Sequence, residues 1–165
     1  MGPEETSVKI EVTRFRESDI DTVFEIQRTA FRPLYEKYRD SDTSPYKERK
    51  ETILRKYTKA GTSGYLFFLD KTAVGAVRIH VDEAGRSGRV SALCVLPRYQ
   101  GRGIAQAALL EIERRHPDVE RWFLDTILEE AGSCHLYEKI GYEKTGEMKA
   151  VNEKMTLVFY EKTRT

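Results

Sequence analysis

Cysteine and long hydrophobic runs are both scarce in this 165-residue chain. Its only two cysteines, Cys94 and Cys134, lie far apart and match no metal-ligand, redox or disulfide-dense spacing. No apolar run approaches the length that spans a bilayer, and the stretch 1–10 lacks the basic and apolar regions of a signal peptide. We therefore expect reduced thiols in a cytoplasmic protein, with no metal and no membrane partner.

An excess of charge of one sign is also lacking. The chain has 28 Lys and Arg against 27 Asp and Glu, a formal net charge of +1. Binding to nucleic acid depends on an excess of basic residues that neutralise phosphates, so no nucleic-acid partner is predicted. With 39% hydrophobic and 33% charged residues, the composition is typical of a globular protein. We expect one domain over 1–165, with 1–7 disordered.

Hydropathy patterns divide the chain into strands and helices. The first strand is predicted at 8–15, and the first helix at 18–31, with Ser18 as N-cap and Pro33 as terminator. A tyrosine-rich loop is expected at 34–46. The later elements are helices at 47–58, 104–116 and 133–139, and strands at 65–70, 73–81, 90–96, 121–128 and 154–162.

This order of elements predicts an α/β (α+β) fold: a mixed, mostly antiparallel central sheet with helices on both faces. The connection between the strands at 90–96 and 121–128 contains a helix and is long enough for a right-handed crossover, so these two strands should be parallel. One parallel junction in a largely antiparallel sheet is a natural place for a cleft.

The stretch RYQGRGIA, 98–105, places two glycines between a predicted strand and a predicted helix. Glycines let main-chain N–H groups converge on an anion, and the helix N-terminus adds partial positive charge, so a phosphate ligand is one hypothesis. The alternative is a tight turn that needs glycine for its shape alone. No Walker Gly-Lys-Ser/Thr is present, and Gln106 breaks the dinucleotide-binding GxGxxG spacing.

Two motifs carry a resemblance to a known family. Gln100, Gly103 and Ala105 fit the spacing Gln-x-x-Gly-x-Gly/Ala, which is similar to the coenzyme A signature of the GNAT family of N-acetyltransferases. The stretch HLYEKIGYEKTGE, 135–147, resembles that family's short helix that carries a tyrosine and ends at a glycine-aromatic pair, here Gly141 and Tyr142. The resemblance implies a GNAT-like fold whose parallel junction is splayed, and acetyl coenzyme A as cosubstrate.

The resemblance also implies which residues bind coenzyme A. The pantetheine arm would pair with the exposed main chain of the strand end, and the pyrophosphate would be held by main-chain amides of the glycine loop and first helical turn. The N–H near Val95 could also contact the developing oxyanion. The implied cofactor-binding residues are Leu93, Cys94, Val95, Gln100, Gly101, Arg102, Gly103, Ile104, Ala105 and Gln106.

Acetyl transfer to an amine needs an acid for the departing thiolate and a base for the amine. Tyr137 matches the family's usual acid, the alternative being a packed aromatic ring. Asp125, in the apolar strand RWFLDTIL, is the candidate base, against a structural carboxylate or a water chain. Glu130 stands where many relatives have a cofactor-contacting asparagine, so that role is not transferred. His135 is better explained as a surface histidine.

The predicted function is acetyl transfer from acetyl coenzyme A to a primary amine of a small molecule or of a protein or peptide, by direct attack in a ternary complex. The alternatives are a non-catalytic acyl-coenzyme A sensor and a small nucleotide-binding regulator. Acceptor choice should lie with 34–46, the turn at 82–83 and the loop 147–152. Tyr35, Tyr38, Asp40 and Asp42 could surround a cationic amine or face water. Whether the chain forms a homodimer stays open.

Overall fold

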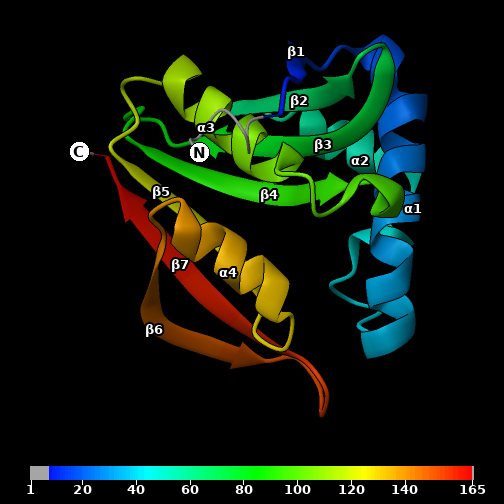
Figure 1. The fold of residues 1–165 in the computed structure, drawn as a ribbon, viewed down its shortest axis with the longest axis vertical. Helices are drawn as coiled ribbons and strands as arrows, with labels where there is room; N and C mark the ends of the chain where they lie inside the picture. The colour runs from blue at the N-terminus through cyan, green and yellow to red at the C-terminus, as the bar shows by residue number, and fades with distance from the viewer. Residues whose placement is uncertain (1–7, 165) are drawn as a thin grey trace.

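A computed structural model describes residues 8–164, so the expected disorder of 1–7 lies outside the described residues. Within this range a seven-stranded sheet has the order β1-β2-β3-β4-β5-β7-β6 (Figure 1). The strands are β1 (Glu11–Arg14), β2 (Thr62–Leu69), β3 (Thr72–Val81), β4 (Ser87–Val95), β5 (Arg121–Ile127), β6 (Glu143–Ala150) and β7 (Thr156–Thr163). The helices are α1 (Ile20–Tyr38), α2 (Lys50–Tyr57), α3 (Ile104–Arg115) and α4 (Ala131–Lys139).

Strand pairing confirms the predicted fold class. The described strands pair antiparallel except for β4 and β5, which pair in parallel after the crossover through α3. The crossover connection is required because parallel neighbours cannot be joined by a tight turn. The sheet is therefore mixed and mostly antiparallel, with its parallel junction at the predicted position.

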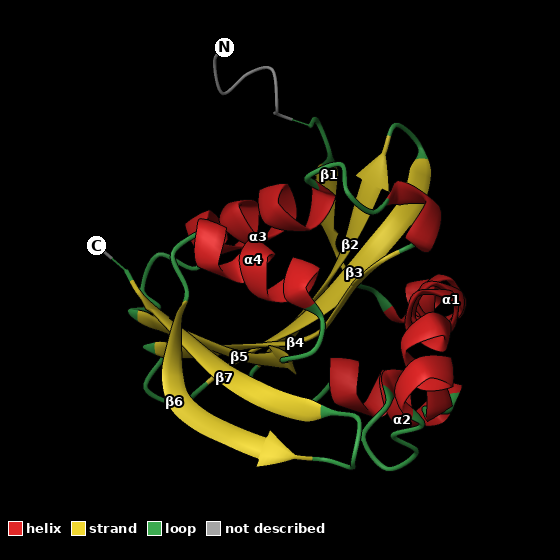
Figure 2. Cartoon of the chain, turned by 60° about the horizontal axis from the view of Figure 1, so that its bottom comes forward, coloured by secondary structure: helices red, strands yellow, loops and turns green. Residues whose placement is uncertain are grey.

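Helices cover both faces of the sheet, as predicted (Figure 2). On one face, α3 and α4 pack on a core that includes Trp122 and Leu109. On the other face, α1 and α2 pack on a second cluster that includes Val23, Ile53 and Leu66. Each fully buried side chain of this size stabilises the fold by about 1.5–3 kcal/mol relative to exposure, so both layers hold the sheet in place.

Helix α1 is longer than predicted, because Pro33 lies inside it and does not end it. Proline removes one i→i−4 hydrogen bond and normally kinks or ends a helix. Here the helix continues to Tyr38, whose side chain is buried, and it ends where Arg39 adopts a left-handed conformation with φ 54°. Tertiary contacts of the last turn therefore outweigh the local cost of the proline, and the expected loop begins only after Tyr38.

The start of this helix also differs from the prediction. A short 3₁₀ turn at Glu17–Asp19 precedes α1, and Asp19 stands at the N-cap in place of Ser18. The Arg16 amide, at the N-cap of the 3₁₀ turn, donates a hydrogen bond of 2.8 Å to Oδ2 of Asp19, and the Asp19 side chain makes no cap hydrogen bond to α1 itself. An acidic side chain here also complements the helix dipole.

Strand β6 was not predicted at all. It forms the edge of the sheet, pairs only with β7 among the described strands, and is exposed at every one of its 8 positions. Since neither face is buried, its sequence EKTGEMKA carries no alternation of apolar and polar residues. Much of the expected loop 147–152 is therefore strand.

Candidate active site

The parallel junction is splayed. β4 and β5 pair only where Ser87–Arg89 meets Arg121–Phe123, although β4 continues to Val95 and β5 continues, paired with β7, to Ile127. The second half of β4 thus has no strand partner on its β5 side in the described part of the chain. The segment 93–95 that was predicted to pair with the pantetheine arm lies in this half.

A β-bulge distorts β4 at the splay. Ala76 of β3 lies opposite Cys94, and Arg78 lies opposite Ser91, so Val77 alone opposes both Ala92 and Leu93. Ala92 has φ 52°, a left-handed conformation that costs a non-glycine residue about 1–3 kcal/mol. No pattern in the sequence indicates the bulge, because alanine does not signal this conformation. The bulge turns the main chain of β4 away from regular pairing beside the gap.

The glycine loop has the geometry of an anion site. Gly101 and Gly103 have φ values of 78° and 81°, and Gly103 is the N-cap of α3. Within residues 8–164 the amides of 101–103 donate to no backbone carbonyl, and those of the first turn of α3 have no partner inside the helix. A Cβ added at Gly101 would meet nothing within 4 Å, so glycine is needed there for its conformation. These features fit the pyrophosphate of coenzyme A.

Gln100 has a different place from the other predicted cofactor-binding residues. Its Nε2 donates a hydrogen bond of 2.9 Å to the carbonyl oxygen of Val95, which ties the loop to the end of β4. Arg98 and Arg102 lie over the ring of Tyr99, 5.4 and 5.3 Å from its centroid. Both cations thus stay close to the loop and add positive charge around it.

Tyr137 is held on α4 with its ring packed against two other tyrosines. The ring centroids lie 6.0 Å from Tyr142 and 6.2 Å from Tyr160, and the residue is 8% exposed. Tyr137 also lines a cavity beside the splay. Burial raises the pKa of Tyr137 well above its usual value, so the phenol is protonated at neutral pH. The side chain is therefore both a packed aromatic ring and a protonated phenol in the lining of the cavity.

Asp125 lies on β5 and lines the same cavity. It follows the buried Leu124, so strand alternation turns its side chain to the opposite face of the sheet, where α1 and α2 lie. Burial raises the pKa of the Asp125 carboxyl above its ordinary value, while Arg89, whose Nη1 lies 3.4 Å from Oδ2, acts in the other direction. A carboxylate of raised pKa that is 37% exposed at a cavity can accept a proton.

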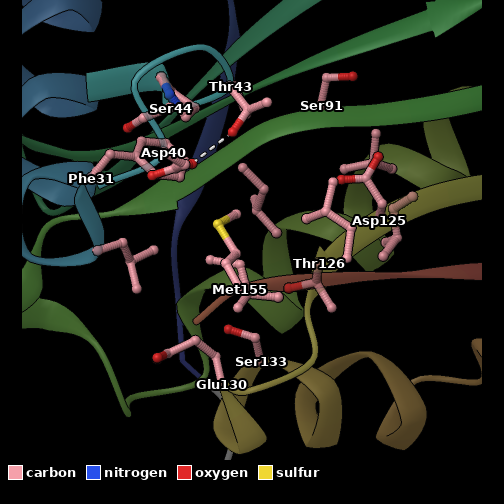
Figure 3. A pocket seen from close by; sticks show the side chains of 18 of the residues that line it. Phe31, Asp40, Thr43, Ser44, Ser91, Asp125, Thr126, Glu130, Ser133 and Met155 are labelled. Atoms are coloured by element: carbon pink, nitrogen blue, oxygen red, sulfur yellow. Dashed lines mark hydrogen bonds between the residues drawn. The ribbon is translucent and has the colours of Figure 1, made fainter. Parts of the chain in front are cut away.

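The cavity has a volume of about 410 Å³ and lies between the sheet and the end of α1 with its following segment. Figure 3 shows Asp40 and Thr43 on one wall, facing Asp125 and Thr126 on the other. Asp40 is buried and accepts a hydrogen bond of 2.8 Å from Oγ1 of Thr43. Of the predicted acceptor regions, the stretch after α1 lines the cavity, whereas the turn at 82–83 does not.

Glu130 and Asn152 join the end of α1 to the other half of the sheet. Glu130 accepts hydrogen bonds from the Tyr38 hydroxyl at 2.5 Å and from Nζ of Lys37 at 2.8 Å, and Asn152 donates to the Tyr38 carbonyl at 2.8 Å. Burial opposes ionisation of Glu130, but these two donors lower its pKa below the usual value. The carboxylate is engaged in closing the cavity wall, which gives it a structural role that no sequence motif indicated.

Cys94, His135 and Tyr35, which the sequence raised as candidates, do not take part in the cavity through their side chains. The Cys94 thiol lies in the cluster under α1 and α2, donates to the Ala76 carbonyl at 3.8 Å, and has a pKa that burial raises to about 12. It is inert packing, and only its main chain faces the splay. His135 is exposed on α4. Tyr35 stacks on Tyr46, 5.2 Å between ring centroids, outside the cavity lining.

Several cavity residues were not predicted as functional. The polar ones come from the segment before α2 and from α2, β3, β4, β5 and α4, and no local motif marks them. They are Glu48, Lys56, Arg78, Ser91, Thr126 and Ser133. Hydrophobic patterning could only indicate that Arg78 interrupts the apolar strand AVGAVRIHV. The tertiary fold alone brings these groups together.

A glycine loop with unpaired amides, a splayed parallel pair and a cavity that holds a protonated phenol and a carboxylate thus adjoin one another. The profile of the acetyltransferase (GNAT) family matches residues 21–142, and the chain belongs to this family. Family membership supports acetyl transfer, with coenzyme A as the carrier. A comparison with curated protein sequences found no match.

Solved structures of acetyltransferases share the fold. PaiA N-acetyltransferase from Thermoplasma acidophilum, in complex with coenzyme A, is 18% identical with a TM-score of 0.75, covering 95% of this chain and 100% of that one. The ribosomal-protein-S18-alanine N-acetyltransferase of Escherichia coli is 12% identical with a TM-score of 0.76, covering 94% of each chain. Spermidine N-acetyltransferase from Vibrio cholerae, with coenzyme A and spermine, is 15% identical with a TM-score of 0.74, covering 93% and 95%.

The described residues form neither a membrane-spanning helix nor a cluster of metal ligands. None of the helices between residues 8 and 164 is both long and apolar enough to cross a membrane. Over the same range, no group of three or more His, Cys, Asp and Glu side chains is arranged so that it could hold a metal ion.

Proposed function

We propose that the chain transfers the acetyl group of acetyl coenzyme A to a primary amine, by direct attack in a ternary complex. The observation that carries the proposal is the splay of β4 from β5, with the glycine loop just beyond β4 and the cavity of Asp125 and Tyr137 beside the gap. Acetyl coenzyme A would supply an acetyl group activated as a thioester.

The cosubstrate would be held mainly by main-chain groups. The loop amides from Gly101 to Gln106 would bind the pyrophosphate, and the unpaired edge of β4 at 93–95 would bind the pantetheine arm. Gln100 supports this site by fastening the loop to Val95, and Arg102 adds positive charge beside it. Coenzyme A binding should therefore tolerate most side-chain changes in the loop other than at the glycines.

Two protein groups would account for the protons that move in the transfer step. The amine nitrogen forms a bond to the acetyl carbonyl carbon, the carbon–sulfur bond breaks, and its electron pair leaves with the sulfur. The Asp125 carboxylate takes the proton that the amine loses, directly or through water, and the Tyr137 hydroxyl gives its proton to the thiolate. The raised pKa of Asp125 makes its carboxylate more basic, and the Tyr137 phenol is protonated at neutral pH, as a proton donor must be.

A mixture of small amines and peptides, incubated with acetyl coenzyme A, tests the proposal. The expected result is release of coenzyme A that depends on added amine, together with a product that is heavier by one acetyl group in mass spectrometry. Calorimetry of acetyl coenzyme A binding is run in parallel. Tight binding with no product from any amine would contradict the enzyme and favour an acyl-coenzyme A sensor instead.

A further inference from the structure

Arg78 carries a charge that the protein does not neutralise. Its side chain leaves β3 and lines the cavity. Among residues 8–164 the guanidinium takes part in no ion pair, and its Nε is buried without a hydrogen-bond partner. A partly buried cation without a partner is costly, because water no longer solvates it fully and no anion compensates.

The other charged groups of the cavity lining are all engaged within the described chain. Glu48 accepts a hydrogen bond of 2.7 Å from Nε2 of Gln27 and pairs with Lys56. The remaining carboxylates are also bound: Asp40 by Thr43, Asp125 by Arg89, and Glu130 by Lys37 and Tyr38. Among the described residues of the lining, Arg78 is thus the one charged group with neither a hydrogen bond nor an ion pair, whereas Asp40, which has no cationic partner either, is held by the Thr43 hydroxyl.

Arg78 and Asp125 lie in one row across three strands. Arg78 is directly opposite Ser91, and the parallel register of Arg89 with Phe123, continued by two residues, would bring Ser91 level with Asp125. Adjacent strands are about 5 Å apart, so the two charged residues start about 10 Å apart or somewhat more, given the splay. Their side chains lie on the same face of the sheet and line the same cavity. An uncompensated cation thus lies at one end of the row, and the candidate base at the other.

We propose that Arg78 binds a carboxylate of the acceptor, so that the substrate is an amine that also carries a carboxylate, the class of free amino acids. The proposal rests on the proposed function, since it places the amine at Asp125. A guanidinium presents two parallel donors that match a carboxylate, and this anion would compensate the buried charge. An acceptor with a second amino group in place of the carboxylate would bring two cations together, so polyamines should be poor substrates.

The test compares each protein-forming L-amino acid with its primary amide, in which a neutral group of similar size replaces the carboxylate. With acetyl coenzyme A at saturation, we expect the best amino acid to exceed its amide in kcat/KM by about 10- to 100-fold, the range for losing a charged hydrogen bond. Spermidine, which has no carboxylate, is expected to react no better than the amides.

Two variants assign the preference to Arg78. Arg78→Met should bring the ratio of amino acid to amide close to one, chiefly by raising KM for the amino acid, and Arg78→Lys should restore part of it. Lys56→Met is the matched control, since it removes a cation of the same cavity that Glu48 already neutralises. The ratio should be unchanged in this control, and acetyl coenzyme A affinity should be unchanged in all three variants.

Equal rates with amino acids and amides, or a ratio that survives Arg78→Met, would overturn the inference while leaving acetyl transfer intact. If amino acids and amides fail to react while another amine of the mixture is acetylated, the inference fails and the proposed function stands; if no amine at all is acetylated, the proposed function fails, and calorimetry then decides on the site. Titration of the same amino acids into protein loaded with coenzyme A would support the carboxylate site if it shows binding that Arg78→Met removes. Absence of binding there would refute it.

Discussion

The glycine loop and the cavity adjoin the same strand, β4, but they are built in different ways. The loop is a local structure in which the amides from Gly101 to Gln106 have no backbone acceptor among the described residues, and we propose that they bind the pyrophosphate. The cavity is assembled from side chains of α1, the segment after it, α2, β3, β4, β5, α4 and β7. A site made of main-chain groups can therefore be encoded in a few adjacent residues, whereas a cavity made of side chains draws on the whole fold.

The largest effect is expected from a charge placed in the loop. Gly101→Glu should weaken acetyl coenzyme A binding by about 100-fold or more, because the new carboxylate would repel the phosphates that the loop amides bind. Each hydrogen bond to a charged phosphate oxygen is worth about 1.5–3 kcal/mol. Calorimetry measures the affinity. Gly85→Glu is the matched control, since Gly85 has the same φ of 78° and equally open space, but lies in the turn after β3.

Both glycine variants should lose a similar stability, about 1–2 kcal/mol, because both force a side chain into the left-handed region. Only Gly101→Glu should lose the cosubstrate. Equal affinities in the two variants would show that the glycine loop is not part of the cosubstrate site.

The next effect concerns the acid at the cavity. Tyr137→Phe should lower kcat by about 10²–10⁴-fold, the range for losing a general acid, with little change in acetyl coenzyme A affinity. Steady-state kinetics provide the measurement. Tyr142→Phe is the control, because its ring packs on Tyr137 and its buried hydroxyl has no hydrogen-bond partner among the described residues. Full activity of Tyr137→Phe at every pH would leave the residue as packing alone.

Asp125 should set the acidic limb of the pH profile. Only the carboxylate form accepts a proton, so kcat/KM should fall as pH falls through the pKa of Asp125, which burial raises above the ordinary value of about 4. Asp125→Asn should lower kcat/KM by about 100-fold at neutral pH and abolish this limb. Arg89→Gln removes the group that lowers the pKa of Asp125, so the limb should move to higher pH. A limb that stays in place in both variants would assign it to another group.

The smallest effect is expected at Glu130, whose hydrogen bonds join the end of α1 to the start of α4. Glu130→Gln should reduce the free energy of unfolding by about 0.5–1.5 kcal/mol and raise the KM of the acceptor a few-fold, because the bond from Tyr38 weakens and the pair with Lys37 is lost. Thermal unfolding and kinetics measure the two effects. Lys37→Met should change stability less, since Lys37 is 59% exposed in that pair.

The same contact has a pH signature. The pKa of Glu130 is lowered in the folded chain, so its contribution to stability is present above the pKa of the unfolded carboxyl and is lost as pH falls through the lower folded value. Glu130→Gln should therefore lose more Tm at neutral pH than at acidic pH. An equal loss at both would mean that the charge of Glu130 does not stabilise the wall.

The conformation of the glycine loop could be predicted from local sequence. Gly101 and Gly103 adopt positive φ angles that other residues avoid, so the need for glycine is visible in the sequence itself. The parallel junction followed from the length of the crossover between β4 and β5. Elements that depend on distant contacts were predicted less well: α1 runs past Pro33 because Tyr38 is anchored, and β6 is invisible because neither of its faces is buried.

The sequence by itself thus determined the order of the strands and helices apart from β6, the parallel junction and the conformation of the glycine loop, because these follow from hydropathy periodicity and from the steric limits of single residues. Only the tertiary structure decided the bulge at Ala92, the hydrogen bonds of Glu130 to the end of α1, and the placing of Arg78 and Asp125 in the lining of one cavity. Those features arise where segments far apart in the chain pack together, and the energies that select them belong to pairs of residues that no local pattern connects.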